Sequence, residues 1–137
     1  MSAPAEKREL EEGVVFAPKF DVNGLIVCVT VEAATREVLM VAYMNRLALD
    51  KTIETGFAHY WSRSRQSLWR KGDTSGQTQK VLSLQIDCDQ DALLLAVEVG
   101  GDGKACHTGR KSCFYRALDP NGALVFTHDG RSPAHDG

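Results

Sequence analysis

The amino-acid sequence predicts an α+β domain, made mainly of antiparallel β-sheet with one principal helix. Several short stretches are continuously apolar or alternate apolar with polar residues, as strands do, whereas a single stretch has both the spacing and the end signals of a helix. The 137 residues fit one domain. Because a chain this small buries limited surface of its own, we expect the domain to form an intertwined homodimer.

The first predicted elements are a β-hairpin and the helix. Leu25–Glu32 is apolar and rich in residues that favour strands, and Glu37–Tyr43 returns after a turn, which is typical of a hairpin. Asn45 is a good N-cap, because its short side chain accepts a hydrogen bond from an unpaired backbone amide. Apolar residues follow at helical spacing and Gly56 is a typical stop, so we predict a helix over Arg46–Thr55. The apolar residues of this helix are Leu47, Leu49 and Ile53.

Four more extended segments complete the predicted sheet. They are Phe57–Ser62, Gln66–Lys71, Gln79–Asp87 and Ala92–Val99. The third segment alternates, with Leu82, Leu84 and Ile86 on its apolar side. Neither chain end has apolar periodicity, so we expect flexible tails at 1–13 and 128–137 around a folded domain at 14–127.

Composition narrows the class of protein. The formal charge of -2 gives no electrostatic reason to expect binding to nucleic acid or to a membrane surface. No apolar run approaches the roughly 20 residues that span a bilayer, and the amino terminus lacks the basic and apolar regions of a signal peptide. We therefore expect a cytoplasmic protein, whose four cysteines are ligands or reduced thiols rather than disulfides. Cys28 lies in an apolar run, and we interpret it as a small buried hydrophobic residue.

The other three cysteines suggest metal chemistry. Cys106, His107 and Cys113 lie close together in the sequence, and Cys88 lies upstream between aspartates. Thiolates are soft ligands for zinc, and a zinc ion with three protein ligands keeps a position open for a water that ionises near neutral pH. The Cys-x6-Cys spacing is looser than that of common structural zinc sites. Cysteine chemistry alone therefore leaves inert or redox thiols equally open.

An acidic triplet surrounds the first of these cysteines. Asp87, Asp89 and Asp91 share one face if the strand stays extended, and Cys88 and Gln90 then point to the other. Ionised carboxylates repel one another unless a cation or basic groups offset them, and such oxygen ligands suit magnesium. A solvated acidic turn between two strands is the alternative, and the residues alone favour it.

Hydroxyl and cationic side chains gather in two neighbouring segments. They are Ser62, Arg63, Ser64 and Arg65 in the first, and Lys71, Thr74 and Ser75 in the second. Arginine binds phosphate through paired hydrogen bonds, and hydroxyls with turn amides complete such a cradle. The cluster alone would suit any anionic ligand, RNA stacked on Trp61 and Trp69, or a solvated basic surface over packed aromatic rings.

Four motifs in one order carry a resemblance to a known family. They are Tyr60-Trp61-Ser62-Arg63-Ser64-Arg65-Gln66, Leu68–Gly76, Asp87–Leu94 and Ala105–Arg116. They resemble phosphoribosyl-AMP cyclohydrolase, which performs an early hydrolytic step of histidine biosynthesis. The similarity runs from about Gly24 to Arg116, and several long motifs in register make a chance match very improbable.

The resemblance implies a metal-dependent hydrolase. It implies that Cys88, Cys106 and Cys113 bind zinc, one ion per subunit, in a site shared between the two chains of a homodimer. It also implies that Asp87, Asp89 and Asp91 bind magnesium. Water would attack the six-position carbon of the adenine ring of phosphoribosyl-AMP, and the bond to the phosphoribosylated ring nitrogen would open.

The resemblance also gives roles to the remaining candidates. The family's substrate carries two phosphates, so the two hydroxyl- and cation-rich segments are expected to bind them. His107 is predicted to act as the general acid or base, because its intrinsic pKa lies near the working range, with orientation of the site as the alternative role. We interpret His59 as a structural histidine. Only 21 residues follow Arg116, so we expect a monofunctional enzyme without the second domain of some relatives.

Two other functions differ in testable ways. A zinc nucleobase deaminase would need a His-x-Glu motif followed by Pro-Cys-x-x-Cys, and the sequence contains neither. A non-enzymatic zinc or thiol module would bind nucleic acid through its arginine and tryptophan residues. A gel-shift assay beside an absorbance assay on phosphoribosyl-AMP separates these classes.

Overall fold

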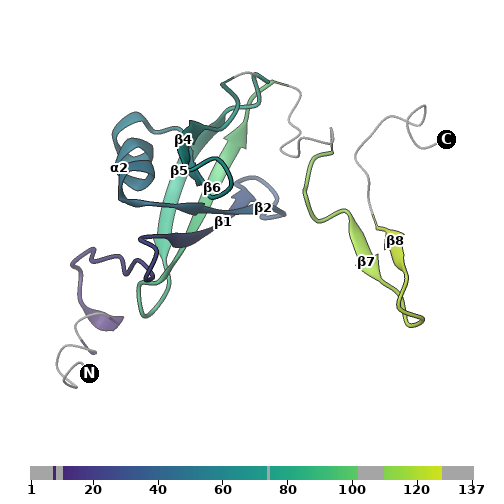
Figure 1. Cartoon of the computed structure of the whole chain (residues 1–137), viewed down its shortest axis with the longest axis horizontal. Coiled ribbons are helices and arrows are strands. Elements are labelled where there is room, and N and C mark those ends of the chain that lie inside the picture. The colour runs from purple at the N-terminus through teal and green to yellow at the C-terminus, as the bar shows by residue number, and fades with distance from the viewer. Residues whose placement is uncertain (1–7, 9–10, 74, 102–109, 128–137) are drawn as a thin grey trace.

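The computed structural model describes residues 8, 11–73, 75–101 and 110–127 (Figure 1). Its strands are β1 (Ile26–Glu32), β2 (Val38–Met44), β3 (His59–Ser62), β4 (Ser67–Arg70), β5 (Gln79–Ile86), β6 (Ala92–Val99), β7 (Arg116–Leu118) and β8 (Leu124–Phe126), and its principal helix is α2 (Arg46–Thr55). The predicted α+β class with a mainly antiparallel sheet is therefore confirmed. The predicted tail 128–137 and most of 1–13 lie outside the described residues.

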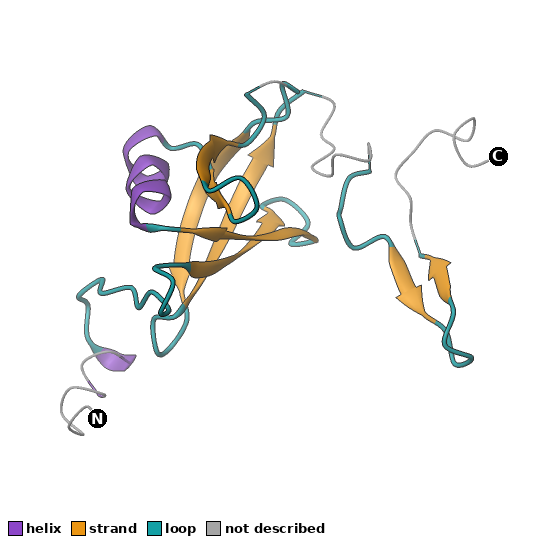
Figure 2. Ribbon diagram, in the orientation of Figure 1, coloured by secondary structure: helices purple, strands orange, loops and turns teal. Residues whose placement is uncertain are grey.

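Four strands form the central sheet, in the order β2-β1-β6-β5. The outer pairs, β1 with β2 and β5 with β6, are antiparallel hairpins, and the two hairpins meet through the parallel pair β1 and β6. β3 and β4 form a separate antiparallel pair next to α2, and β7 and β8 form another (Figure 2). Among the described helices, none is long and apolar enough to cross a membrane.

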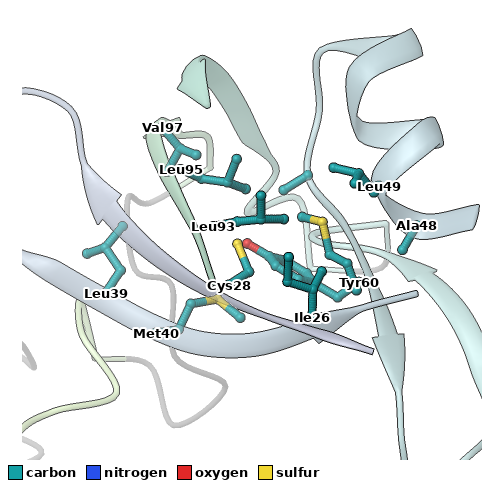
Figure 3. Packing of buried hydrophobic residues seen from close by; sticks show 12 residues of the cluster. Ile26, Cys28, Leu39, Met40, Ala48, Leu49, Tyr60, Leu93, Leu95 and Val97 are labelled. Atoms are coloured by element: carbon teal, nitrogen blue, oxygen red, sulfur yellow. The ribbon is translucent and has the colours of Figure 1, made fainter. Parts of the chain in front are cut away.

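The core lies between the sheet, α2 and β3 (Figure 3). Tyr60 is fully buried, and its hydroxyl donates to Gln79 Oε1 at 2.6 Å and lies 2.8 Å from Thr30 Oγ1. Because both neighbours are also fully buried, this contact satisfies polar groups that would otherwise be unpaired in an apolar interior. Apolar side chains from four elements belong to the same core: Ile26, Leu39, Leu49, Leu93, Leu95 and Val97.

The helix begins and ends where the sequence predicts. Asn45 Oδ1 accepts from the amide of Ala48 at 2.9 Å, and Gly56 closes the helix in the left-handed region at φ 77°. The predicted apolar face is partly wrong, because Leu47 and Ile53 are exposed. The buried side chains are Ala48, Leu49 and Thr52.

Strand β5 departs from simple alternation. Its register with β6 shifts between Val81 and Ser83, so a bulge turns Leu82 outward and leaves it 51% exposed. Val81 takes its place and packs against the core together with Leu84 and Ile86. The prediction that Leu82 faces the core was therefore wrong, because a bulge reverses the facing of every residue on one side of it.

The hairpin β7–β8 was not predicted. All its strand residues are exposed, and Figure 2 shows it standing apart from the sheet. The chain leading to it is held at the edge of β2, where Ser112 Oγ donates to Val38 O at 2.7 Å and the amide of Cys113 donates to Leu39 O at 2.7 Å. The segment of residues 114–127, here called the β7–β8 arm, thus leaves the sheet at Ser112 and Cys113, which are bonded to β2.

Candidate functional site

The acidic triplet lies in the turn between β5 and β6. The strand ends at Ile86, so the extended arrangement on which the shared face depended does not exist. The turn nevertheless brings the carboxylates of Asp87, Asp89 and Asp91 within 4.8 Å of one another, all exposed. Asp87 Oδ1 shapes this turn by accepting from the amides of Asp91 at 2.9 Å and Ala92 at 3.1 Å.

The electrostatics of the turn favour a bound cation. Hydrogen bonds shared with the carboxyl of Asp89, and next with that of Asp87, raise the pKa of Asp91 to about 6. Partial burial raises the pKa of Asp87, but the amides of Asp91 and Ala92 outweigh it and lower that pKa. Asp91 therefore takes up a proton at a higher pH than an ordinary aspartate does, because its two acidic neighbours lie so close. The turn is thus a pre-arranged set of hard oxygen donors, as magnesium prefers.

Cys113 sits at the opposite side of the sheet. It is exposed, and its neighbour Lys111 pairs through Nζ with Glu32 at 2.9 Å and with Glu37 at 3.1 Å. Hydrogen bonds to Glu32 and next to Glu37 raise the pKa of Lys111. Together with the buried hydroxyl of Ser112, this pairing fixes Cys113 beside the β1–β2 hairpin. Cys106 and His107 lie outside the described residues.

One chain does not bring Cys88 and Cys113 together. Cys88 lies in the turn that joins β5 to β6, whereas the amide of Cys113 is bonded to β2, which β1 separates from β6. At about 4.8 Å per strand across the sheet and about 3.3 Å per residue along it, the two residues are on the order of 20 Å apart. Sulfur ligands of one zinc ion lie about 2.3 Å from the metal. Within the described residues of one chain, these two thiols therefore lie too far apart to bind the same zinc ion.

The first hydroxyl- and cation-rich segment forms the tip of the β3–β4 hairpin. Ser62 Oγ accepts from the amide of Arg65 at 3.2 Å and lies 3.4 Å from Ser64 Oγ, so the hydroxyls line one turn. The guanidinium of Arg63 stacks on the ring of Tyr43 at 4.1 Å, which ties this turn to β2. A cationic, hydroxyl-rich turn of this kind can bind one phosphate.

The second segment lies at the other end of the same hairpin. Lys71 follows β4 and lies 5.7 Å from the ring centre of Trp69, whereas Ser75 Oγ accepts from the amide of Gln77 at 3.3 Å. Thr74 lies outside the described residues. The four-residue strands keep the two segments about 10 Å apart, so within one chain they form two places for a phosphate rather than two walls of one.

Two other residues behave as their sequence context predicts. His59 is buried, and its Nδ1 lies 2.8 Å from Phe57 O, which confirms a structural histidine. Cys28 is fully buried, which confirms the prediction of a small buried residue, and burial raises the pKa of its thiol to about 12.

Comparison with known proteins gives one consistent result. The model of the phosphoribosyl-AMP cyclohydrolase family matches residues 40–115. The chain is 58% identical to the phosphoribosyl-AMP cyclohydrolase of Chelativorans sp. (strain BNC1), over 92% of this chain and 91% of the relative. It is 57% identical to that of Brucella canis over 89% and 88% of the two chains, and 56% identical to that of Brucella anthropi over 93% and 91%. The family match spans the acidic turn, both phosphate-binding candidates and Cys113.

Proposed function

The chain belongs to the phosphoribosyl-AMP cyclohydrolase family, as its motifs predicted, and we propose that it opens the adenine ring of phosphoribosyl-AMP by zinc-dependent hydrolysis in histidine biosynthesis. The observation that carries this proposal is the 58% identity, which extends over 92% of the chain rather than over a single motif. The acidic turn and the two separated candidate phosphate-binding segments lie inside the matched region. They fit a metal-dependent enzyme whose substrate carries two phosphates.

Zinc would be held by Cys88 of one chain and by Cys106 and Cys113 of the other. The donor set fits, because Cys88 and Cys113 expose soft sulfur ligands whereas Cys28 is sealed in the core. Bound zinc supplies a water that ionises near neutral pH. His107, next to Cys106 in the sequence, would move the proton during attack on the ring.

A homodimer is part of the proposal. The separation of Cys88 from Cys113 within one chain supports a site built between chains. Exposed apolar residues on the β7–β8 arm support it independently, because a small soluble domain seldom leaves so many of them in water. These residues are Phe114, Leu118, Leu124, Val125 and Phe126.

Magnesium would bind at Asp87, Asp89 and Asp91, and the phosphates would bind at the two ends of the β3–β4 hairpin. The close grouping of the three carboxylates supports the first assignment, since their oxygens lie within 4.8 Å of one another and a cation would offset their mutual repulsion. The hydroxyls of Ser62 and Ser64 beside Arg63 support the second.

The assay that tests the function follows the absorbance change as phosphoribosyl-AMP is hydrolysed by the zinc-loaded protein, with a gel-shift assay on RNA and DNA beside it. We expect turnover with zinc present and no shift at physiological salt, because the chain carries a net charge of -2. Nucleic-acid binding without turnover would instead establish the non-enzymatic alternative.

A further inference from the structure

The segment of residues 15–21, here called the amino-terminal strap, lies outside the matched family region and is fastened to the acidic turn. Gln90 holds it from the middle of that turn: Oε1 accepts from the amide of Ala17 at 2.7 Å, Nε2 donates to Val15 O at 3.2 Å, and its carbonyl accepts from the amide of Lys19 at 2.7 Å. Gln90 is 4% exposed and adopts φ 61°, a left-handed conformation that non-glycine residues seldom take. A strained, buried residue with three such bonds fixes the strap to the turn.

The strap forms one wall of a groove of about 420 Å³. Val27 and Tyr43 of the β1–β2 hairpin and Asp91 of the acidic turn also line it. The remaining lining residues are Lys19, Phe20, Asp21 and Leu25. The volume falls within the range of small-molecule sites, and the lining combines apolar with charged side chains.

Of the charged groups in the groove, Lys19 is available to a ligand and Asp21 is not. Asp21 Oδ1 already accepts from the amides of Asn23 at 2.8 Å and Leu25 at 3.0 Å, which closes the turn before β1. Lys19 is exposed, while its backbone is held by Gln90. The backbone of Lys19 is therefore fixed beside the acidic turn, and its side chain lines the groove.

The ring of Tyr43 connects this groove to the phosphate-binding candidate on β3–β4. It lines the groove, and the guanidinium of Arg63 stacks on it at 4.1 Å. The strap and the acidic turn thus both line the groove, and Arg63 is joined to it through the ring of Tyr43.

We propose that this groove binds a ribose 5-phosphate unit of the substrate, with Lys19 as a phosphate contact supplied by the amino-terminal strap. The apolar lining residues suit the C–H faces of a sugar, and an ammonium group forms charge-assisted hydrogen bonds to phosphate. The inference rests on the proposed function, because that function supplies a substrate with phosphorylated riboses.

The test compares Lys19→Gln with Lys80→Gln, an exposed lysine on β5 that serves as the matched control. With magnesium and zinc present, Lys19→Gln should raise KM for phosphoribosyl-AMP about tenfold and leave kcat within about twofold, since a remote phosphate contact contributes equally to ground and transition states. Calorimetry with ribose 5-phosphate should show a similar, about tenfold loss of affinity. Lys80→Gln should match the wild type in both measurements.

The two readouts separate failure of this inference from failure of the proposed function. If the wild type hydrolyses phosphoribosyl-AMP but Lys19→Gln keeps its KM and its affinity for ribose 5-phosphate, the groove is not the phosphate site and the enzyme assignment stands. If the wild type is inactive on phosphoribosyl-AMP, the function fails, and the calorimetry still decides whether Lys19 contributes to binding a sugar phosphate. An equal loss of affinity in Lys80→Gln would show that Lys19 acts only through the overall charge of the protein, and this would overturn the proposal.

Discussion

The two candidate metal regions of this molecule are built in opposite ways. The acidic turn gathers three carboxylates from five consecutive positions to within 4.8 Å, inside one chain. The thiols of Cys88 and Cys113 lie on different sides of the four-stranded sheet, on the order of 20 Å apart by strand spacing. Within one chain the three carboxylates lie together, whereas the two thiols do not.

If the proposed metal sites are right, the difference predicts which of them needs a second chain. A local turn fixes its ligands through its own hydrogen bonds, here from the amides of Asp91 and Ala92 to Asp87, so it forms as soon as the β5–β6 hairpin forms. Ligands carried by separate edges of a sheet come together only when another surface meets them. Magnesium binding should therefore survive in a monomer, whereas zinc binding by three cysteines should not.

The largest expected effect is loss of zinc. Cys106→Ser and Cys113→Ser should each lower activity at least about a hundredfold and strip the metal, because two thiolates cannot replace a three-ligand site. Cys28→Ser is the matched control and should retain zinc and activity, since its thiol is buried away from either region. Metal analysis under reducing conditions should give one zinc per chain in the wild type. Full activity without zinc would contradict the proposed chemistry.

The next largest effect is rescue between inactive variants. If each site takes Cys88 from one chain and Cys113 from the other, a Cys88→Ser chain paired with a Cys113→Ser chain makes one site with both lesions and one with none. Random pairing makes half the dimers mixed, so about a quarter of the wild-type activity should return after refolding the two together. Mixed dimers confirmed by mass but as inactive as their parents would show that all ligands come from one chain.

The local features were predictable because short-range chemistry determines them. The helix bounds follow from Asn45 and Gly56, each of which completes a hydrogen bond within four residues. The facing of Leu82 was not predictable, because the bulge depends on how β5 pairs with β6 and leaves no mark on the apolar alternation. The β7–β8 arm was missed because its strands are three residues long, too short for alternation to show.

The candidate site divides in the same way. The acidic residues were identified correctly as a group, but they converge through a turn rather than along a strand. Nothing in the sequence pattern indicated that Gln90 would tie residues 15–19 to that turn, or that Tyr43 would meet Arg63, because both contacts join segments far apart in the chain. The burial of Gln90 is visible only in the structure, where its amide needs such partners.

Removing one carboxylate tests the acidic turn. Asp89→Asn should weaken the dependence of activity on magnesium about tenfold and keep the zinc content of the wild type, because the two regions share no ligand atom in one chain. A magnesium titration measures the first effect and metal analysis the second. A variant that responds to magnesium as the wild type does would make Asp89 an ordinary turn residue.

The pH dependence of the same titration gives the sign of the effect. The folded-state pKa of Asp91 is raised to about 6, so without metal its contribution favours folding at low pH and is lost as the pH rises through that value. Magnesium competes with the proton on Asp91, and its affinity should therefore fall as the pH drops below about 6. In Asp89→Asn the hydrogen bond that chiefly raises this pKa changes, and the fall should move to lower pH.

The smallest expected effect concerns how firmly Cys113 is held. Lys111 bridges Glu32 and Glu37 two residues before the thiol, at 2.9 and 3.1 Å, with side chains between a quarter and about a third exposed. Because such pairs contribute about 1 kcal/mol or less, Lys111→Met should change the free energy of unfolding little, the more so since Ser112 keeps its bond to Val38. Zinc affinity should nevertheless fall several-fold, since a ligand freed to move loses orientation before the fold loses stability.

Lys51→Met is the matched control for that variant, because Lys51 pairs with Glu54 at 3.9 Å on the exposed side of α2, away from every proposed ligand. A chelator competition measures zinc affinity and thermal unfolding measures stability, each on the dimer. Equal zinc affinity in Lys111→Met and Lys51→Met would show that Ser112 and the amide of Cys113 suffice to hold the thiol at β2. A loss of zinc affinity confined to Lys111→Met would show that the pairing of Lys111 with Glu32 and Glu37 helps to orient the Cys113 thiol for zinc.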